Sequence, residues 1–131
     1  QKAELLLAEA EEFLTNRIKE DPRNYRNYYI LSLIHSLMKI NPQEALKLAR
    51  KSVELLGHPD SYYALGLSFL INNEIEKAMQ SLRKALQINP NHIFSLYELA
   101  KIFKETLKRP TDAEVYYKKL LNINPNFRFL Q

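Results

Sequence analysis

Side chains able to do chemistry are few in this sequence, and they are scattered. The three histidines, His35, His58 and His92, are far apart along the chain, and none belongs to an HExxH zinc motif or a nucleophile motif. Cysteine is absent, which excludes thiolate catalysis, a Cys-ligated zinc site and disulfides. Glycine occurs only at positions 57 and 66, so a glycine-rich phosphate loop cannot form. The sequence therefore predicts a protein that is not an enzyme and has no catalytic residue, metal site or cofactor.

Charged residues are the other candidates for a functional surface. Residues 1–21 carry 3 basic and 6 acidic side chains, residues 22–92 carry 9 and 5, and residues 93–131 carry 7 and 4. The acidic cluster Glu9, Glu11 and Glu12 is interpreted as a solvated helix face rather than a metal site. The chain thus has an acidic start and a basic remainder, a polarity that could steer a charged partner.

Composition bounds the fold that carries these residues. At 131 residues the chain has the length of one domain, and its 46% hydrophobic and 26% charged residues are typical of a globular protein. Only 2 glycines and abundant Leu, Ala, Lys and Glu favour an all-α fold. No apolar run approaches the ~20 residues of a membrane span, so no membrane insertion is predicted. A soluble protein of the cytoplasm or periplasm is expected, and abundant Asn, Ile, Lys and Tyr suggest a bacterial source.

A repeat of 34 to 35 residues organises the chain. The segment NYYILSL at 27–33 recurs as SYYALGL at 61–67 and, more weakly, as SLYELAK at 95–101, both at an offset of 34. A second segment, LRKALQINPN at 82–91, recurs as YKKLLNINPN at 117–126, at an offset of 35. Self-similarity at this period indicates a stack of helical units, each of which buries its apolar face against its neighbours.

Apolar residues three and four apart, turn residues and prolines divide the units into helices. Asn41, Asn73 and Thr111 each precede a glutamate by three residues, so all three are predicted to cap helix starts. The prolines at 22, 90 and 125 are predicted to end helices. Seven helices are expected, at about 2–20, 24–38, 42–56, 59–71, 74–88, 92–107 and 111–123.

The middle unit resembles the tetratricopeptide repeat, in which large, small and aromatic residues recur at fixed positions of two antiparallel helices. The matching residues are Tyr62, Leu65, Gly66, Phe69, Ala78, Leu82, Ala85 and Pro90. The two flanking units match less completely, and each has one extra turn residue. The resemblance covers essentially the whole chain. It implies a right-handed α-α superhelix of three hairpins plus an N-terminal helix, forming one domain over residues 1–131.

Within that domain the repeat register divides the chain. Residues 1–22 resemble the second helix of a partial repeat whose first helix lies outside the sequence, and 25–58, 59–92 and 93–127 are expected to be three repeats. Residues 128–131 would begin a truncated repeat or a cap. Because repeat stacks need their last apolar face covered, we expect either further repeats in the native protein or Phe127 and Leu130 folded back as a lid.

The resemblance also implies where a ligand would lie, because the first helices of such a superhelix line its concave face. The register places there Arg26, Tyr29, Leu33, Tyr63, Leu67, Leu70, Phe94, Tyr97, Lys101 and Lys104, together with Ser36 and Asp60. The three tyrosines form a ladder, one per repeat, beside a basic end. We therefore predict a protein–protein interaction scaffold, part of a larger protein or complex, that binds an amphipathic helix or an extended apolar segment with an acidic neighbour.

One specialisation of the family is absent. Some members clamp the C-terminal carboxylate of a chaperone peptide with Lys, Asn and Arg on three successive first helices. The corresponding positions here are Tyr29, Leu33, Ala64, Phe94 and Glu98. Binding to chaperone tails of that kind is therefore disfavoured.

Two alternatives stay open. The acidic first helix and the basic last hairpin of neighbouring copies could stack head to tail, which would make a homo-oligomer through the stack ends. Basic residues also recur on the second helices and could bind nucleic acid, but solvated lysine is usual on outward faces, so nucleic acid is the less favoured partner. These basic residues are Lys47, Arg50, Lys51, Arg83, Lys84, Lys118 and Lys119.

Overall fold

The computed structural model describes residues 2–127, which fold into seven α-helices and one π-helical turn with no strand among them. The helices are α1 (Lys2–Glu20), α2 (Tyr25–Met38), α3 (Pro42–Leu55), α4 (Pro59–Ile71), α5 (Ile75–Ile88), α6 (Ile93–Lys101) and α7 (Pro110–Ile123), with the π-turn η1 (Ile102–Thr106) after α6. The expected all-α fold of seven helices is confirmed. The expected repeat start or cap at 128–131, including Leu130, lies outside the described residues.

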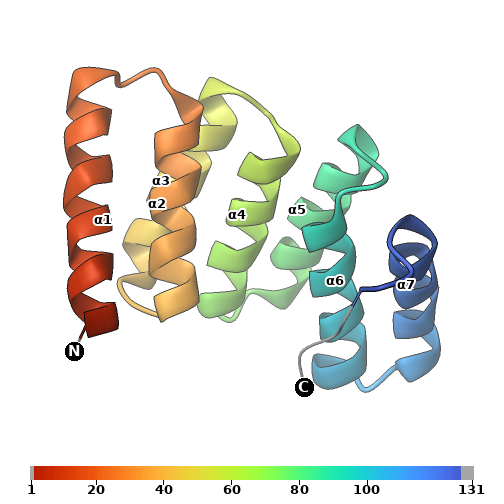
Figure 1. The fold of residues 1–131 in the computed structure, drawn as a ribbon. Coiled ribbons are helices and arrows are strands. Elements are labelled where there is room, and N and C mark those ends of the chain that lie inside the picture. The colour runs from red at the N-terminus through yellow and green to blue at the C-terminus, as the bar shows by residue number, and fades with distance from the viewer. Residues whose placement is uncertain (1, 128–131) are drawn as a thin grey trace.

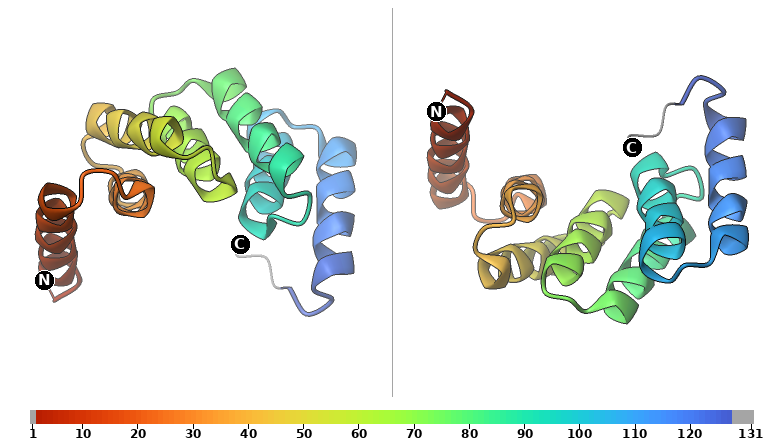
Figure 2. Two further views of the ribbon diagram at one scale, coloured as in Figure 1. Left: turned by 90° about the horizontal axis from the view of Figure 1, so that it is seen from above. Right: turned by 90° about the horizontal axis from the view of Figure 1, so that it is seen from below.

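The helices stack side by side as three antiparallel hairpins, α2–α3, α4–α5 and α6–α7, with α1 packed on the far side of α2 (Figure 1). Seen along the helix axes, the stack curves into an arch (Figure 2). Helices α2, α4 and α6 line the inner side of the arch, and α3, α5 and α7 form its outer side. This is the right-handed superhelix that the resemblance to the tetratricopeptide repeat implies.

Small residues let the two helices of a hairpin approach closely. Gly66 of α4 faces α5, where an added Cβ would come within 2.9 Å of the fully buried Leu82 side chain. Ala45 of α3 and Ala78 of α5 are completely buried, and Ala113 of α7 is 1% exposed. The repeat pattern of small residues is therefore a packing requirement, because a larger side chain at any of these positions would push the paired helices apart.

The two interfaces between hairpins are built differently. Between the first and second hairpins, the Ser32 and Ser68 hydroxyls lie 3.0 Å apart, and both are bonded to the Ala45 carbonyl oxygen, at 2.7 and 3.1 Å. Between the second and third hairpins, Ile102 takes the position 34 residues after Ser68 and packs in an apolar cluster with Leu82 and Leu99. The first interface is thus fixed by directional hydrogen bonds and the second mainly by apolar burial.

The three predicted capping boxes are wrong. Asn41 precedes α3 but makes no side-chain cap bond, because its backbone is left-handed with φ of 43°. Asn73 is also left-handed, at φ of 60°, and α5 begins one residue later than it would after an Asn73 cap. Helix α7 begins at Pro110, so Thr111 is already inside the helix. At the first two sites a left-handed residue closes the tight turn between helices, and that backbone geometry excludes the extended conformation an N-cap needs.

Side-chain caps occur instead at the starts of the inner helices. The Asn24 side chain accepts from the backbone N–H of Arg26 at 3.1 Å, and His58 Nδ1 accepts from the N–H of Asp60 at 3.0 Å. His92 Nδ1 faces the N–H of Ser95 at 3.3 Å. Both histidines are thus N-cap residues, and their imidazoles satisfy backbone donors of the first helical turn.

The end of α6 departs from a regular helix. The predicted helix 92–107 continues from α6 into η1, where the N–H of Leu107 bonds to the carbonyl of Ile102, five residues earlier, at 2.9 Å. A π-turn accommodates one inserted residue without breaking the helix. This is the physical outcome of the extra turn residue seen in the third unit of the sequence.

Candidate partner-binding groove

The tyrosine ladder lies on the inner helices, at one register position per hairpin. Tyr29 is on α2, Tyr63 on α4 and Tyr97 on α6, and each side chain is half-buried. Phe94 lies between two rungs, with its ring 5.6 Å from the Tyr63 ring. The inner side of the arch is therefore aromatic from the second hairpin into the third.

A recess of about 300 Å³ opens on this side between α2, α4 and α6. It is lined by Tyr29, Leu33, Leu37, Asp60, Tyr63 and Phe94. Two of the large apolar side chains that line it are highly exposed to solvent: Leu37 is 70% exposed and Phe94 is 61% exposed. Exposed apolar surface gathered in a concavity is typical of a binding site rather than of an ordinary protein surface.

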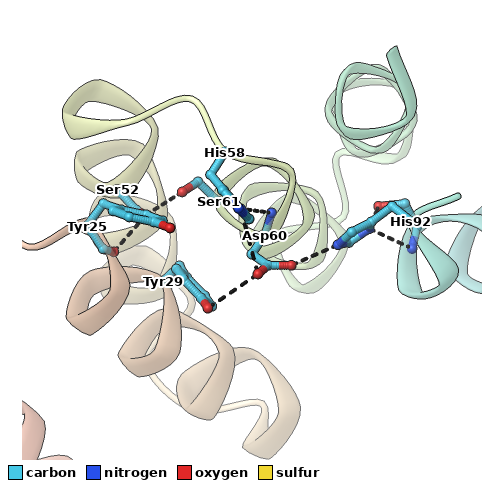
Figure 3. A network of polar contacts seen from close by, with 8 residues as sticks. Tyr25, Tyr29, Ser52, His58, Asp60, Ser61 and His92 are labelled. Carbon is cyan, nitrogen blue, oxygen red and sulfur yellow. Dashed lines mark hydrogen bonds and ion pairs between the residues drawn. The ribbon is translucent and has the colours of Figure 1, made fainter. Parts of the chain in front are cut away.

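Asp60 connects the inner helices at the wall of the recess (Figure 3). One carboxylate oxygen, Oδ2, accepts a 3.4 Å hydrogen bond from the Tyr29 hydroxyl of α2, and the other, Oδ1, is 2.8 Å from His92 Nε2 at the start of α6. His58 Nδ1 lies 3.7 Å from Oδ2 on the same helix turn. The carboxylate thus links α2, α4 and the start of α6, and it fixes the spacing of these inner helices around the recess.

Burial raises the pKa of several polar side chains in and beside the groove. It raises the pKa of Tyr63 far above its ordinary range, and the nearby Glu98 carboxylate adds to that effect. Burial also raises the pKa of Tyr29, with the Asp60 charge as the next contribution. The pKa of Glu98 is itself raised by burial, against the opposing charge of Lys101. The tyrosine hydroxyls therefore stay protonated at neutral pH, and the Tyr29 hydroxyl donates its proton to Asp60 within the chain.

The structure brings only part of the predicted residue set to the recess. Tyr29, Leu33, Tyr63 and Phe94 line it together, whereas Leu67 is 6% exposed and belongs to the core. A buried Leu67 offers little surface to a partner.

Leu70, also on α4, packs against the core clusters and borders a separate recess beside Pro42 and Asn73, near the hairpin turns. Ser36 is buried and shares a hydrogen bond with Ser68 at 3.4 Å. Leu70 therefore lies near the hairpin turns, and Ser36 lies in the interior of the stack.

The basic end and Arg26 lie outside the recess. The Arg26 guanidinium stacks over the Tyr25 ring at 5.0 Å, and the Lys101 ammonium lies 5.6 Å from the Tyr97 ring centre. Lys104 is exposed on η1. Phe127, from the segment after α7, lies 5.8 Å from Tyr97 between ring centres, so the third rung of the ladder already has an aromatic neighbour within the chain.

Two contributors escaped the sequence analysis. Leu37 lies four residues after Leu33 on the same face of α2, so the helical period could have identified it. The contact between Asp60 and His92 had no signal in the sequence. The two residues are 32 positions apart, and they meet only because of how the second and third hairpins pack.

The described residues contain neither a candidate metal-binding cluster nor a candidate membrane-spanning helix. No group of three or more His, Cys, Asp or Glu side chains between residues 2 and 127 could hold a metal ion. Over the same residues, no helix combines the length and the apolar character needed to cross a bilayer. The groove offers a concave shape, aromatic surface and polar side chains, which are means of binding.

Comparison with protein families agrees with this architecture. A family model described as tetratricopeptide repeat matches residues 59–92, and a second model of the same description matches residues 94–126. Together they cover about half of the 131 residues. Neither model describes a catalytic family.

Relatives and solved structures give the same picture. The chain is 29% identical over 110 residues to anaphase-promoting complex subunit 3 of Schizosaccharomyces pombe, and 35% identical over 71 residues to the type IV pilus assembly protein PilF of Pseudomonas aeruginosa. These matches cover 83% and 54% of this chain but only 16% and 28% of the relatives. A crystal structure of MamA superposes with a TM-score of 0.76 at 22% identity, covering 96% of this chain and 73% of that one, which is a likeness of fold.

Proposed function

Since the chain belongs to the tetratricopeptide repeat family, a family of protein–protein interaction scaffolds, we propose that it holds a segment of another protein in the concave groove of its inner helices. The segment is a peptide or a helix with an apolar face. The scaffold works within a larger protein or complex, where it positions the bound partner.

The observation that carries this proposal is the recess between α2, α4 and α6. An apolar concavity of about 300 Å³ fits one large aromatic side chain or two aliphatic ones. Tyrosine and phenylalanine walls bury much area at small entropic cost, and such pockets commonly supply most of an interface's binding energy. The hydrogen bonds of Asp60 hold the walls of the recess in place before binding, so the side chains lose little conformational entropy when the partner enters.

Charge selects among the segments that could enter. Arg26 lies at the α2 side of the groove, and Lys101 and Lys104 lie at the α6 side. A partner with acidic residues flanking its apolar anchor would gain favourable contacts at both sides, mainly as faster association and better discrimination.

Site-specific photo-crosslinking tests the proposal. The photoreactive residue p-benzoylphenylalanine replaces Phe94, which is 61% exposed in the recess, and in a matched control it replaces Val115, which is 55% exposed on α7. In extract of the native cell, a partner that crosslinks from position 94 and not from position 115 supports the groove. Equal crosslinking from both positions, or from 115 alone, would move the binding surface away from the recess and refute the proposal.

A further inference from the structure

One carboxylate on the inner helices has no bonding partner in the described structure. Glu98 lies on α6, one helical turn after Phe94, and its side chain is half-buried. Over the described part of the chain it forms no hydrogen bond and no ion pair. Asp60, in contrast, is bonded through both of its carboxylate oxygens. Glu98 is therefore a charge in the groove that the fold leaves without a direct partner.

Glu98 faces the second hairpin rather than an end of the stack. Ile102, one turn further along the same face of α6, packs in a cluster with Leu82 of α5. The Glu98 charge also contributes to the raised pKa of Tyr63 on α4, so the two side chains are close together. Both of these neighbours belong to the second hairpin. The missing partner of Glu98 therefore does not depend on where the chain begins or ends.

The repeat does not require a carboxylate at this position. Ala64 stands there on α4, 34 residues earlier, and it is completely buried. It lies on the face that meets α2, one turn before Ser68, whose hydroxyl is 3.0 Å from that of Ser32. The small residue lets α2 and α4 pack directly, whereas α6 packs on α5 and α7 instead. Glu98 thus stands in the wider space between α4 and α6, on the inner side of the arch (Figure 2).

A charge at this place costs stability. Burial raises the pKa of Glu98, because the ionised carboxylate is less well solvated in the folded chain than in the unfolded one. Lys101 opposes that effect without forming an ion pair with Glu98, and its ammonium lies over the Tyr97 ring. A half-buried charge that the fold does not pair is typical of functional sites, where stability is lowered in favour of binding.

The surroundings of Glu98 fit a cation. Tyr63 and Phe94, which line the recess, are its neighbours, and their rings lie 5.6 Å apart. Aromatic faces accommodate the aliphatic stem and the charged head of lysine or arginine. A hydrogen bond between two charged groups is about twice as strong as one between neutral groups. A neutral donor would leave the Glu98 charge in place, whereas an ammonium or guanidinium would neutralise it.

We propose that Glu98 selects the partner segment by charge: the segment carries a lysine or arginine beside the apolar side chain that enters the recess, and this cation pairs with Glu98. The inference rests on the proposed function, because it concerns the same groove. Glu98 is one helical turn, about 5.4 Å, from Phe94 along α6. The cation therefore lies about one or two residues from the apolar anchor in an extended segment, and about three or four in a helix. Acidic residues that meet Arg26 and Lys104 lie further out on the same segment.

A phage-displayed library of random peptides of about 12 residues tests this pairing without a known partner. The library is selected in parallel on the wild-type chain, on Glu98→Gln and on the control Glu76→Gln, which changes an exposed carboxylate of the outer helix α5. Peptides from the wild type and from the control are expected to be several-fold enriched in lysine or arginine close to an aromatic residue or leucine. Peptides from Glu98→Gln should lack that enrichment.

A double-mutant cycle then measures the pair. The most enriched peptide, and a copy with norleucine in place of its basic residue, are titrated by fluorescence anisotropy with wild type and with Glu98→Gln. Loss of the basic residue should weaken binding to the wild type about tenfold and binding to Glu98→Gln less than about twofold. Because Glu98→Gln keeps the shape of the side chain and removes a buried charge, the variant should be at least as stable as the wild type. Weaker binding would then report the lost pair rather than unfolding.

The pairing and the groove can fail separately. A selection on Phe94→Ser, which changes an exposed wall of the recess, should lose the enriched peptides. Peptides that need Phe94 but contain basic residues equally often on wild type and on Glu98→Gln would keep the groove and overturn the pairing. Peptides that bind Phe94→Ser as well as wild type would refute the groove itself. A failure to enrich any peptide on the wild type would count against both.

Discussion

The Asp60 carboxylate and the His92 imidazole are 2.8 Å apart, although they begin two different inner helices. His92 is 8% exposed and also contacts the Ser95 hydroxyl at 2.8 Å, so its ring is held from both sides. This pair is the polar tie between the second and third hairpins, whose interface is otherwise mainly apolar. It sets the distance between α4 and α6, and so the width of the recess.

Breaking this tie should loosen the third hairpin. Asp60→Asn keeps the shape of the side chain but removes its charge, and we expect a loss of about 1 kcal/mol of unfolding free energy, because the carboxylate is partly exposed and a charged hydrogen bond there is partly screened. Urea unfolding measures the loss. Asp112→Asn, which breaks a surface pair with Arg109, is the control and should change stability by less than about 0.5 kcal/mol. Equal effects would show that the tie contributes no more than a surface ion pair.

Alanine should be tolerated differently at the two glycines, because Gly66 lies against the paired helix α5 and Gly57 lies in a turn. Gly66→Ala places a methyl group 2.9 Å from the buried Leu82 side chain, and we expect a net loss of about 1–2 kcal/mol even after the gain of about 1 kcal/mol in helix propensity. Gly57→Ala meets the Tyr62 ring only at 3.3 Å, in a turn, and should be nearly neutral. Thermal unfolding of the two variants compares them directly. A Gly66→Ala variant more stable than wild type would mean that α4 and α5 can separate without cost.

Burial of Glu98 makes stability depend on pH. Its pKa is raised above the ordinary value of 4.5, so between the two values the folded chain binds more protons than the unfolded chain, and stability falls as pH rises through that interval. Glu98→Gln removes the penalty and should stabilise the protein at about pH 7, with the gain shrinking at about pH 3, where the wild-type carboxyl is almost fully protonated in both states. Urea unfolding at the two pH values measures it. The exposed Glu12→Gln variant is the control, and a pH-independent gain from Glu98→Gln would contradict this account.

The sequence predicted the helices well because their causes are local. A 34-residue period, prolines after helices and apolar stripes specify where each helix lies, and the observed bounds agree to within one residue, apart from the π-turn that ends α6. The caps were wrong because Asn41 and Asn73 suit left-handed turns as well as helix starts, and only the packing of the hairpin decides between the two.

The groove was predicted less completely, for a different reason. A repeat register tells which face of a helix a residue is on but not how deep it lies, so Leu67 was assigned to the surface although it is buried. Contacts between repeats, such as Asp60 with His92, arise from the curvature of the whole stack, which local spacing does not encode.

His35 provides the last prediction, because it stands 34 residues before Phe69, where the repeat pattern has an aromatic residue, and it is only 3% exposed. Its Nε2 lies 3.5 Å from the Glu11 carboxylate, whereas its Nδ1 is buried without a hydrogen-bond partner in the described structure. An unsatisfied buried nitrogen costs about 1–3 kcal/mol, so His35→Phe, which restores the aromatic of the repeat pattern, should stabilise the chain by about 1 kcal/mol once the exposed Glu11 contact is subtracted. Thermal unfolding beside Glu11→Gln separates the two contributions. If His35→Phe and Glu11→Gln destabilise the protein equally, the contact between His35 and Glu11 that holds α1 on α2 outweighs the unsatisfied nitrogen.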